Sequence, residues 1–145
     1  SDLRGRSRYN REMIRLLVVD DAPFIREIVR HTVSSPTIEV VGEAEDGVEA
    51  VEKCRELMPD VVLMDIVLPK RSGIDAARMI LADFPQVRIV AFSTNDHDAM
   101  VMKALDAGCC SYVVKPFKPS DLIAAIEQAV AAESGRSGHR RESVG

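Results

Sequence analysis

The stretch Val61-Val62-Leu63-Met64-Asp65 is the feature around which the rest of this chain is organised, because four apolar residues follow one another without a break and end on a carboxylate. Pro59 precedes this run, and a loop from Pro69 to Gly73 follows it. A short, apolar, β-branched run between such breaks is typical of a strand that is buried on both faces. Asp65 would then lie at the carboxyl end of the strand, where open α/β sheets bind their ligands. Taken alone, an acid in this place would more often cap the following loop or helix.

Apolar runs of the same kind alternate with segments of helical periodicity along the chain. Besides 61–65, the pattern predicts strands over 14–19, 38–41, 87–92 and 111–114. It also predicts five helices. The first begins at 23, the next three carry apolar stripes over 48–58, 74–84 and 100–105, and the last covers 119–130. Because each helix must cross over between parallel strands, we expect a single α/β domain with a five-stranded parallel sheet. The pattern alone does not determine the order of the strands.

The composition is that of an ordinary globular protein, with 46% hydrophobic and 29% charged residues in a chain of 145. This length suits one well-buried domain. No apolar run is long enough to span a bilayer and the start has no secretory pattern, so we expect no membrane association and a cytoplasmic location. Cys54, Cys109 and Cys110 match no zinc-site spacing, and we interpret them as reduced residues of the core.

Charge is distributed unevenly along the chain. Arginines concentrate near both ends, whereas residues 17–132 contain 19 acidic and 11 basic residues. An acidic body without a basic face argues against direct binding of nucleic acid by this domain and favours a cation site. Residues 1–12 lack periodicity and are expected to be disordered. The domain should occupy 13–133, and 134–145 should form a flexible tail or a linker.

Several polar side chains follow separate predicted strands. They are Asp20, Asp21, Asp65, Ser93, Thr94 and Lys115. The carboxyl ends of parallel strands share one edge of a sheet, so these side chains should lie close together. Carboxylates in one pocket repel each other unless a cation neutralises them, and Mg²⁺ accepts a few carboxylates while keeping several waters. Since a carboxylate can attack phosphorus while an ammonium and a hydroxyl contact the phosphoryl oxygens, the set indicates Mg²⁺-dependent phosphoryl transfer.

Ordered motifs over roughly residues 13–132 resemble the signature of response-regulator receiver domains, which belong to two-component signalling, and in particular that of CheY-like receivers. The motifs are Val18-Val19-Asp20-Asp21, Met64-Asp65 with Pro69 and Gly73 downstream, Phe92-Ser93-Thr94, and Tyr112-Val113-Val114-Lys115-Pro116-Phe117. The resemblance implies a flavodoxin-like, doubly wound parallel sheet of order 2-1-3-4-5, flanked by five helices. It also implies a cytoplasmic signalling switch, with chemotaxis as one setting.

The resemblance implies a role for each acid. Asp65 would be the phosphoacceptor, which takes its phosphoryl group from a sensor histidine kinase or from a small donor such as acetyl phosphate. Asp21 and Asp65 would bind Mg²⁺ directly, Asp20 through a water and Val67 through its backbone carbonyl. The protein would then be no enzyme in the usual sense, because its chemistry is limited to its own phosphorylation and dephosphorylation.

The resemblance also implies how the signal is passed on. Lys115 would contact the phosphoryl group, and Pro116 would follow it in the cis form. Ser93 and Thr94 would bind the phosphoryl group, and Ser93 would move together with Tyr112 as a coupled switch. The surface of the fourth helix, fifth strand and fifth helix would change and contact a downstream protein or form a phosphorylation-dependent dimer.

Two departures and two alternatives stay open. Val67 replaces a side chain that is often polar in the family and should hinder the hydrolytic water, whereas Asn95 should orient it. A Mg²⁺-dependent aspartyl phosphatase is disfavoured, because such enzymes commonly carry a second carboxylate where this chain has Val67. The chain is either a stand-alone receiver or the amino-terminal receiver of a truncated DNA-binding regulator.

Overall fold

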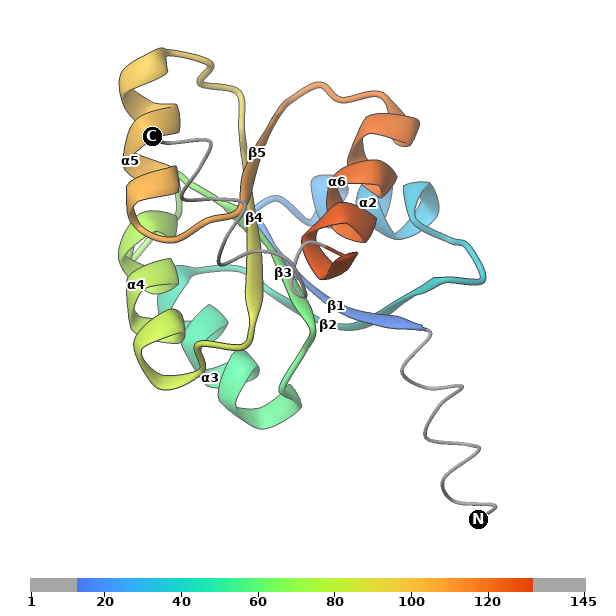
Figure 1. The fold of residues 1–145 in the computed structure, drawn as a ribbon, viewed down its shortest axis with the longest axis horizontal. Coiled ribbons are helices and arrows are strands. Elements are labelled where there is room, and N and C mark those ends of the chain that lie inside the picture. Colours follow the sequence, from blue (N-terminus) through green and yellow to red (C-terminus); the bar gives the residue numbers. More distant parts are fainter. Residues whose placement is uncertain (1–12, 132–145) are drawn as a thin grey trace.

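The computed structural model describes residues 13–131, which form one five-stranded parallel sheet of order β2-β1-β3-β4-β5 (Figure 1). The strands are β1 (Ile14–Val19), β2 (Ile38–Ala44), β3 (Val61–Asp65), β4 (Arg88–Ser93) and β5 (Ser111–Val114). The helices are α2 (Pro23–Thr32), α3 (Gly47–Leu57), α4 (Gly73–Asp83), α5 (Asp98–Asp106) and α6 (Pro119–Ala131). The predicted fold class and strand order are therefore confirmed. The predictions for 1–12 and for the tail from 134 lie outside the described residues.

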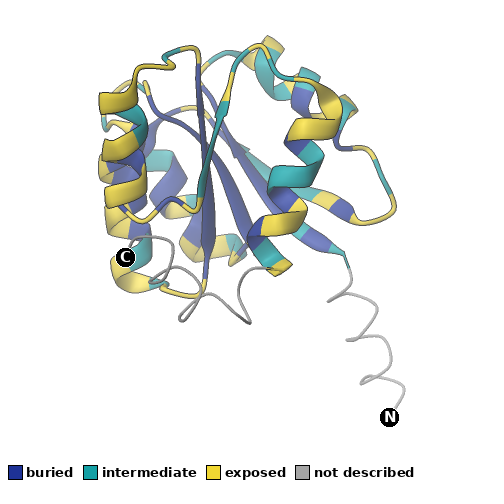
Figure 2. Cartoon of the chain, turned by 45° about the horizontal axis from the view of Figure 1, so that its top comes forward, coloured by how far each residue is buried: buried dark blue, intermediate teal, exposed yellow. Residues whose placement is uncertain are grey.

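The helices form two layers, with α2 and α6 on one face of the sheet and α3, α4 and α5 on the other (Figure 1). Figure 2 shows the inner strands as buried between these layers, while the helices expose their outer faces. Side chains of β3 alternate between the two cores. Val62 and Met64 belong to the core beside α3 and α4, and Val61 and Leu63 to the core beside α2 and α6. Since burial of each aliphatic side chain stabilises the fold by about 1.5–3 kcal/mol, the packing on both faces anchors β3 where it ends at Asp65.

Local signals set several element boundaries. Pro23 opens α2, where its fixed φ is compatible with the first helical turn. Asp46 caps α3 by accepting a hydrogen bond from the Glu49 N–H at 2.7 Å. Gly108, two residues after the end of α5, has a φ of 108°, and a Cβ there would lie 2.5 Å from Leu81 Cδ1.

Three predictions from the sequence were wrong in detail. β2 continues to Ala44 rather than ending at 41, because Gly42 stays in the strand opposite Leu17. β4 begins and ends one residue later than predicted, so that Ser93 is its last residue. Cys110 is exposed and is no core residue, because it precedes the edge strand β5.

The described part of the chain contains no helix that is both long enough and apolar enough to cross a membrane.

Candidate functional site

Three predicted acids meet at the carboxyl edge of the sheet. Asp65 ends the central strand β3 and is 5% exposed, while Asp20 directly follows β1 and is 1% exposed. Asp21 is exposed, at the start of the loop to α2. Carboxylate oxygens of the three residues all lie within 4.8 Å of one another. The topology therefore brings together acids that are 44 or 45 positions apart in the sequence.

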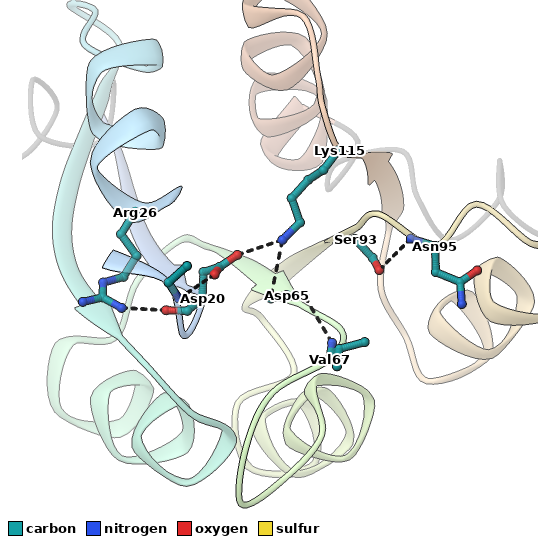
Figure 3. A network of polar contacts seen from close by, with 8 residues as sticks. Asp20, Arg26, Asp65, Val67, Ser93, Asn95 and Lys115 are labelled. Atoms are coloured by element: carbon teal, nitrogen blue, oxygen red, sulfur yellow. Dashed lines mark hydrogen bonds and ion pairs between the residues drawn. The ribbon is translucent and has the colours of Figure 1, made fainter. Parts of the chain in front are cut away.

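Lys115 reaches into this group of acids from the end of β5 (Figure 3). Its Nζ lies 2.9 Å from Asp20 Oδ2 and 3.4 Å from Asp65 Oδ2. The same ammonium lies 4.5 Å from the centroid of the buried Phe92 ring, an arrangement that favours a cation–π contact. The peptide bond between Lys115 and Pro116 is cis, in agreement with the resemblance.

Burial is the main influence on the pKa of the Asp65 carboxyl group. The pKa of Asp65 is raised from 3.8 to about 6; burial is the largest cause, the Lys115 charge lowers this pKa and the neighbouring charge of Asp20 raises it. The Val67 N–H donates a hydrogen bond to Asp65 Oδ1 at 3.1 Å, which also lowers this pKa. Ionisation of Asp65 is thus unfavourable even beside Lys115, unless a further cation is bound.

The donor set fits Mg²⁺. All three acids offer hard oxygen ligands, and a divalent cation would relieve the cost of ionising the buried Asp65. A second acidic group, Glu45, Asp46 and Glu49, has other partners. Asp46 and Glu49 cap the start of α3, and Asp46 also pairs with Lys70 at 3.6 Å.

The predicted switch residues meet at the backbone of Asn95. The buried Ser93 Oγ accepts a hydrogen bond from the Asn95 N–H at 3.0 Å, and the Tyr112 hydroxyl donates to the Asn95 carbonyl at 2.6 Å. Thr94 is exposed, and its part in binding a phosphoryl group stays a prediction. The side-chain oxygen of Asn95 accepts from the His97 N–H at 2.9 Å, so it is engaged away from Asp65.

Sequence reasoning missed two residues around the acids. Phe92 was part of a motif, but its packing under Lys115 was not predicted. Arg26, on α2, donates from Nη1 to the backbone carbonyl of Asp20 at 2.7 Å (Figure 3). Its spacing from Asp21 places it one helical turn into α2, which is the only signal that the sequence offers for this contact.

Fold and site define a receiver domain. Residues 16–127 match the family model described as the response regulator receiver domain, and the chain belongs to this family. Receiver domains are signalling switches that take phosphoryl groups from histidine kinases and act on downstream targets.

Similar proteins include a chemotaxis protein and two proteins of known structure. The chain is 43% identical to the chemotaxis protein CheY of Thermotoga maritima over 114 residues, which cover 79% of this chain and 95% of that protein. A LuxR-family two-component response regulator from Aurantimonas sp. SI85-9A1 has a TM-score of 0.79 at 39% identity, over 83% of this chain and 86% of that one. The CheX–CheY–BeF3–Mg²⁺ complex from Borrelia burgdorferi has a TM-score of 0.77 at 25% identity, over 83% of this chain and 92% of that one. The resemblance to CheY-like receivers is thereby confirmed.

Proposed function

We propose that this domain is a phosphorylation-activated switch in which Asp65 accepts a phosphoryl group from a sensor histidine kinase in a Mg²⁺-dependent reaction. One observation carries the proposal. The Lys115 ammonium lies between the buried carboxylates of Asp20 and Asp65, and Asp21 completes an acidic group that fits a divalent ion. Metal storage alone would not require this lysine or the neighbouring Ser93 hydroxyl.

The chemistry follows from these positions. An oxygen of the Asp65 carboxylate bonds to phosphorus while the bond from phosphorus to the donor's imidazole nitrogen breaks, and the nitrogen keeps the electron pair. Mg²⁺, when bound, would offset charge on the phosphoryl oxygens, held by Asp21 and Asp65 directly, by Asp20 through water and by the Val67 carbonyl. Lys115 would then pair with a phosphoryl oxygen. Water later attacks phosphorus, which restores the carboxylate and releases phosphate.

Asn95 would link the site to the output surface. If Ser93 turns its hydroxyl toward a phosphoryl oxygen, it loses the hydrogen bond that its Oγ accepts from the Asn95 N–H. The carbonyl of Asn95 accepts a hydrogen bond from the Tyr112 hydroxyl, so a shift of the Asn95 backbone would also move Tyr112 on β5. We propose that the surface of α5, β5 and α6 changes in consequence, where Met102 and Val114 are exposed apolar residues.

The partner at this surface is proposed to be a downstream protein, as for a CheY-like receiver in chemotaxis, and a phosphorylation-dependent dimer is the second form of the output. The LuxR-family neighbour favours one alternative, in which this chain is the receiver of a DNA-binding regulator. In that case DNA binding would belong to another domain, because the receiver itself is acidic. The cytoplasmic location stays a prediction.

Phosphorylation of the full chain tests the proposal. Incubation with acetyl phosphate and MgCl₂ should add one phosphoryl group to the wild type by intact-protein mass spectrometry, and none to Asp65→Asn. Omission of MgCl₂ should abolish the labelling. Equal labelling of Asp65→Asn would refute the assignment of the acceptor, and sustained phosphate release from a phosphate ester would point to a phosphatase instead.

A further inference from the structure

We propose that Arg26 is a positioning residue for the metal site: its guanidinium holds the peptide group that joins Asp20 to Asp21 and thereby sets the direction of both carboxylates. The inference rests on the proposed function, because it presumes that these acids bind Mg²⁺. It assigns a role to a residue that is itself neither a metal ligand nor a phosphoryl contact.

The contact is specific in its atoms. Arg26 Nη1 donates to the backbone carbonyl of Asp20 at 2.7 Å, and this carbonyl belongs to the peptide unit shared by the two acids (Figure 3). The Asp20 N–H on the other side donates to the Ala44 carbonyl at 3.1 Å, so the residue is held at both of its backbone polar groups. A planar peptide unit that is fixed at its carbonyl also fixes the Cα atoms at its two ends.

Asp21 depends most on this support. Its side chain is exposed, and within residues 13–131 the structure gives it no hydrogen bond or ion pair. Asp20, by contrast, is held through its side chain as well, because Oδ1 accepts from the Ala22 N–H at 2.9 Å and Oδ2 pairs with Lys115. The backbone is therefore the main structural constraint on where the Asp21 carboxylate points.

Arg26 is itself held in place by β2. Its Nε pairs with Glu43 Oε1 at 2.7 Å, and Arg30 pairs with the other oxygen of the same carboxylate. Burial alone would raise the pKa of Glu43, but the hydrogen bonds and charges of Arg30 and Arg26 together outweigh it and lower this pKa, so Glu43 stays ionised. The Arg26 side chain is only 15% exposed, which leaves its fork little freedom to leave Asp20.

Charge and positioning predict opposite results when Arg26 is removed, which makes the proposal testable. Loss of a nearby positive charge alone should strengthen Mg²⁺ binding. Loss of a support for the ligands should weaken it, by about tenfold if Arg26 acts as outer-shell partners of metal ligands usually do. Arg30→Ala is the matched control. It removes a charge from the same cluster of Glu43, Arg26 and Arg30, here called the Glu43 cluster, but leaves the contact between Arg26 and Asp20 intact.

The experiment is a titration of the ¹⁵N-labelled full chain with MgCl₂, followed through the backbone amide shifts, which also report whether each variant is folded. We expect Arg26→Ala to raise the Kd for Mg²⁺ about tenfold, with Arg30→Ala at or below the wild-type Kd. Arg26→Lys keeps the charge and the stem but lacks the two-pronged fork, so it should also bind more weakly, and it serves if the alanine variant does not fold.

The outcomes are distinct. A wild-type Kd in both Arg26 variants, or tighter binding, would overturn the positioning role while leaving the metal site intact. An equal loss in Arg30→Ala would overturn it too, since the Glu43 cluster as a whole would then be responsible. Failure of the wild type to show saturable Mg²⁺ shifts would instead overturn the proposed function, and the positioning role with it.

Discussion

Lys115 Nζ lies closer to Asp20, at 2.9 Å, than to the proposed acceptor Asp65, at 3.4 Å. The lysine is therefore already paired in the unphosphorylated protein, and its shorter contact is with Asp20, which is not the proposed acceptor. The pairing is shielded, because the side chains of Lys115 and Asp20 are 13% and 2% exposed. This relationship determines how the metal-free protein should respond to substitution in the acidic group.

Replacement of Lys115 should destabilise the metal-free fold. Lys115→Met keeps the apolar stem but leaves two buried carboxylates without their cation, and loss of one partner of a buried pair costs about 3 kcal/mol. Urea denaturation near neutral pH measures the change. Mg²⁺ should restore much of the lost stability, because it neutralises the same acids. A variant as stable as the wild type without Mg²⁺ would show that the pair contributes nothing to the fold.

Replacement of Asp65 should have the opposite effect on stability. Its pKa is raised by burial from 3.8 to about 6, so the contribution of this group to folding is favourable below pH 4 and is lost as pH rises through about 6. Asp65→Asn should therefore stabilise the metal-free protein by about 2–3 kcal/mol at pH 7.5, since each pKa unit corresponds to about 1.4 kcal/mol.

Denaturation over a pH series checks this second prediction. The advantage of Asp65→Asn should shrink toward pH 4, where the wild-type carboxyl is also neutral. Saturating Mg²⁺ at pH 7.5 should stabilise the wild type more than the variant. A difference that does not change with pH would contradict the raised pKa.

The exposed side chain of Val67 should slow the loss of the phosphoryl group. Val67 is 66% exposed beside Asp65, so Val67→Asn should change stability little. A polar group there can hydrogen-bond the hydrolytic water, and about 1 kcal/mol from one such bond corresponds to roughly fivefold in rate. Decay of ³²P-labelled protein should thus be faster in the variant. Equal or slower decay would show that Val67 does not limit hydrolysis.

Removal of the Tyr112 hydroxyl should separate phosphorylation from its consequence. Tyr112→Phe loses the 2.6 Å bond to the Asn95 carbonyl and about 1 kcal/mol of stability, but no group that touches Asp65. Labelling by acetyl phosphate should remain normal. The amide shifts that phosphorylation causes in β5 and α5 should become smaller. Unchanged shifts would mean that the Asn95 link does not carry the response.

Periodicity and residue order were sufficient to predict a five-stranded parallel sheet and the meeting of the acids, whereas the strand order came from the family resemblance. The position of Asp65 could be predicted because several apolar runs in this chain end on polar residues. That repetition indicates buried parallel strands whose carboxyl ends form a ligand site. Gly42 was misjudged as a strand end, since only the tertiary structure shows why a glycine fits within β2: a Cβ there would lie 2.5 Å from Leu57 Cδ1. Arg26 and Tyr112 contact backbone carbonyls, which every residue has, so residue identity alone does not predict these partners.

The position of Lys115 among the acids also fixes a charge stoichiometry. Asp20, Asp21 and Asp65 carry three negative charges when ionised, and Lys115 carries one positive charge. The four side chains together therefore have a formal net charge of −2. A divalent ion balances the pocket, whereas a monovalent ion such as K⁺ leaves it negative and a trivalent ion overshoots. The lysine would thus set which ionic charge balances the acidic edge of the sheet, quite apart from any contact with a phosphoryl group.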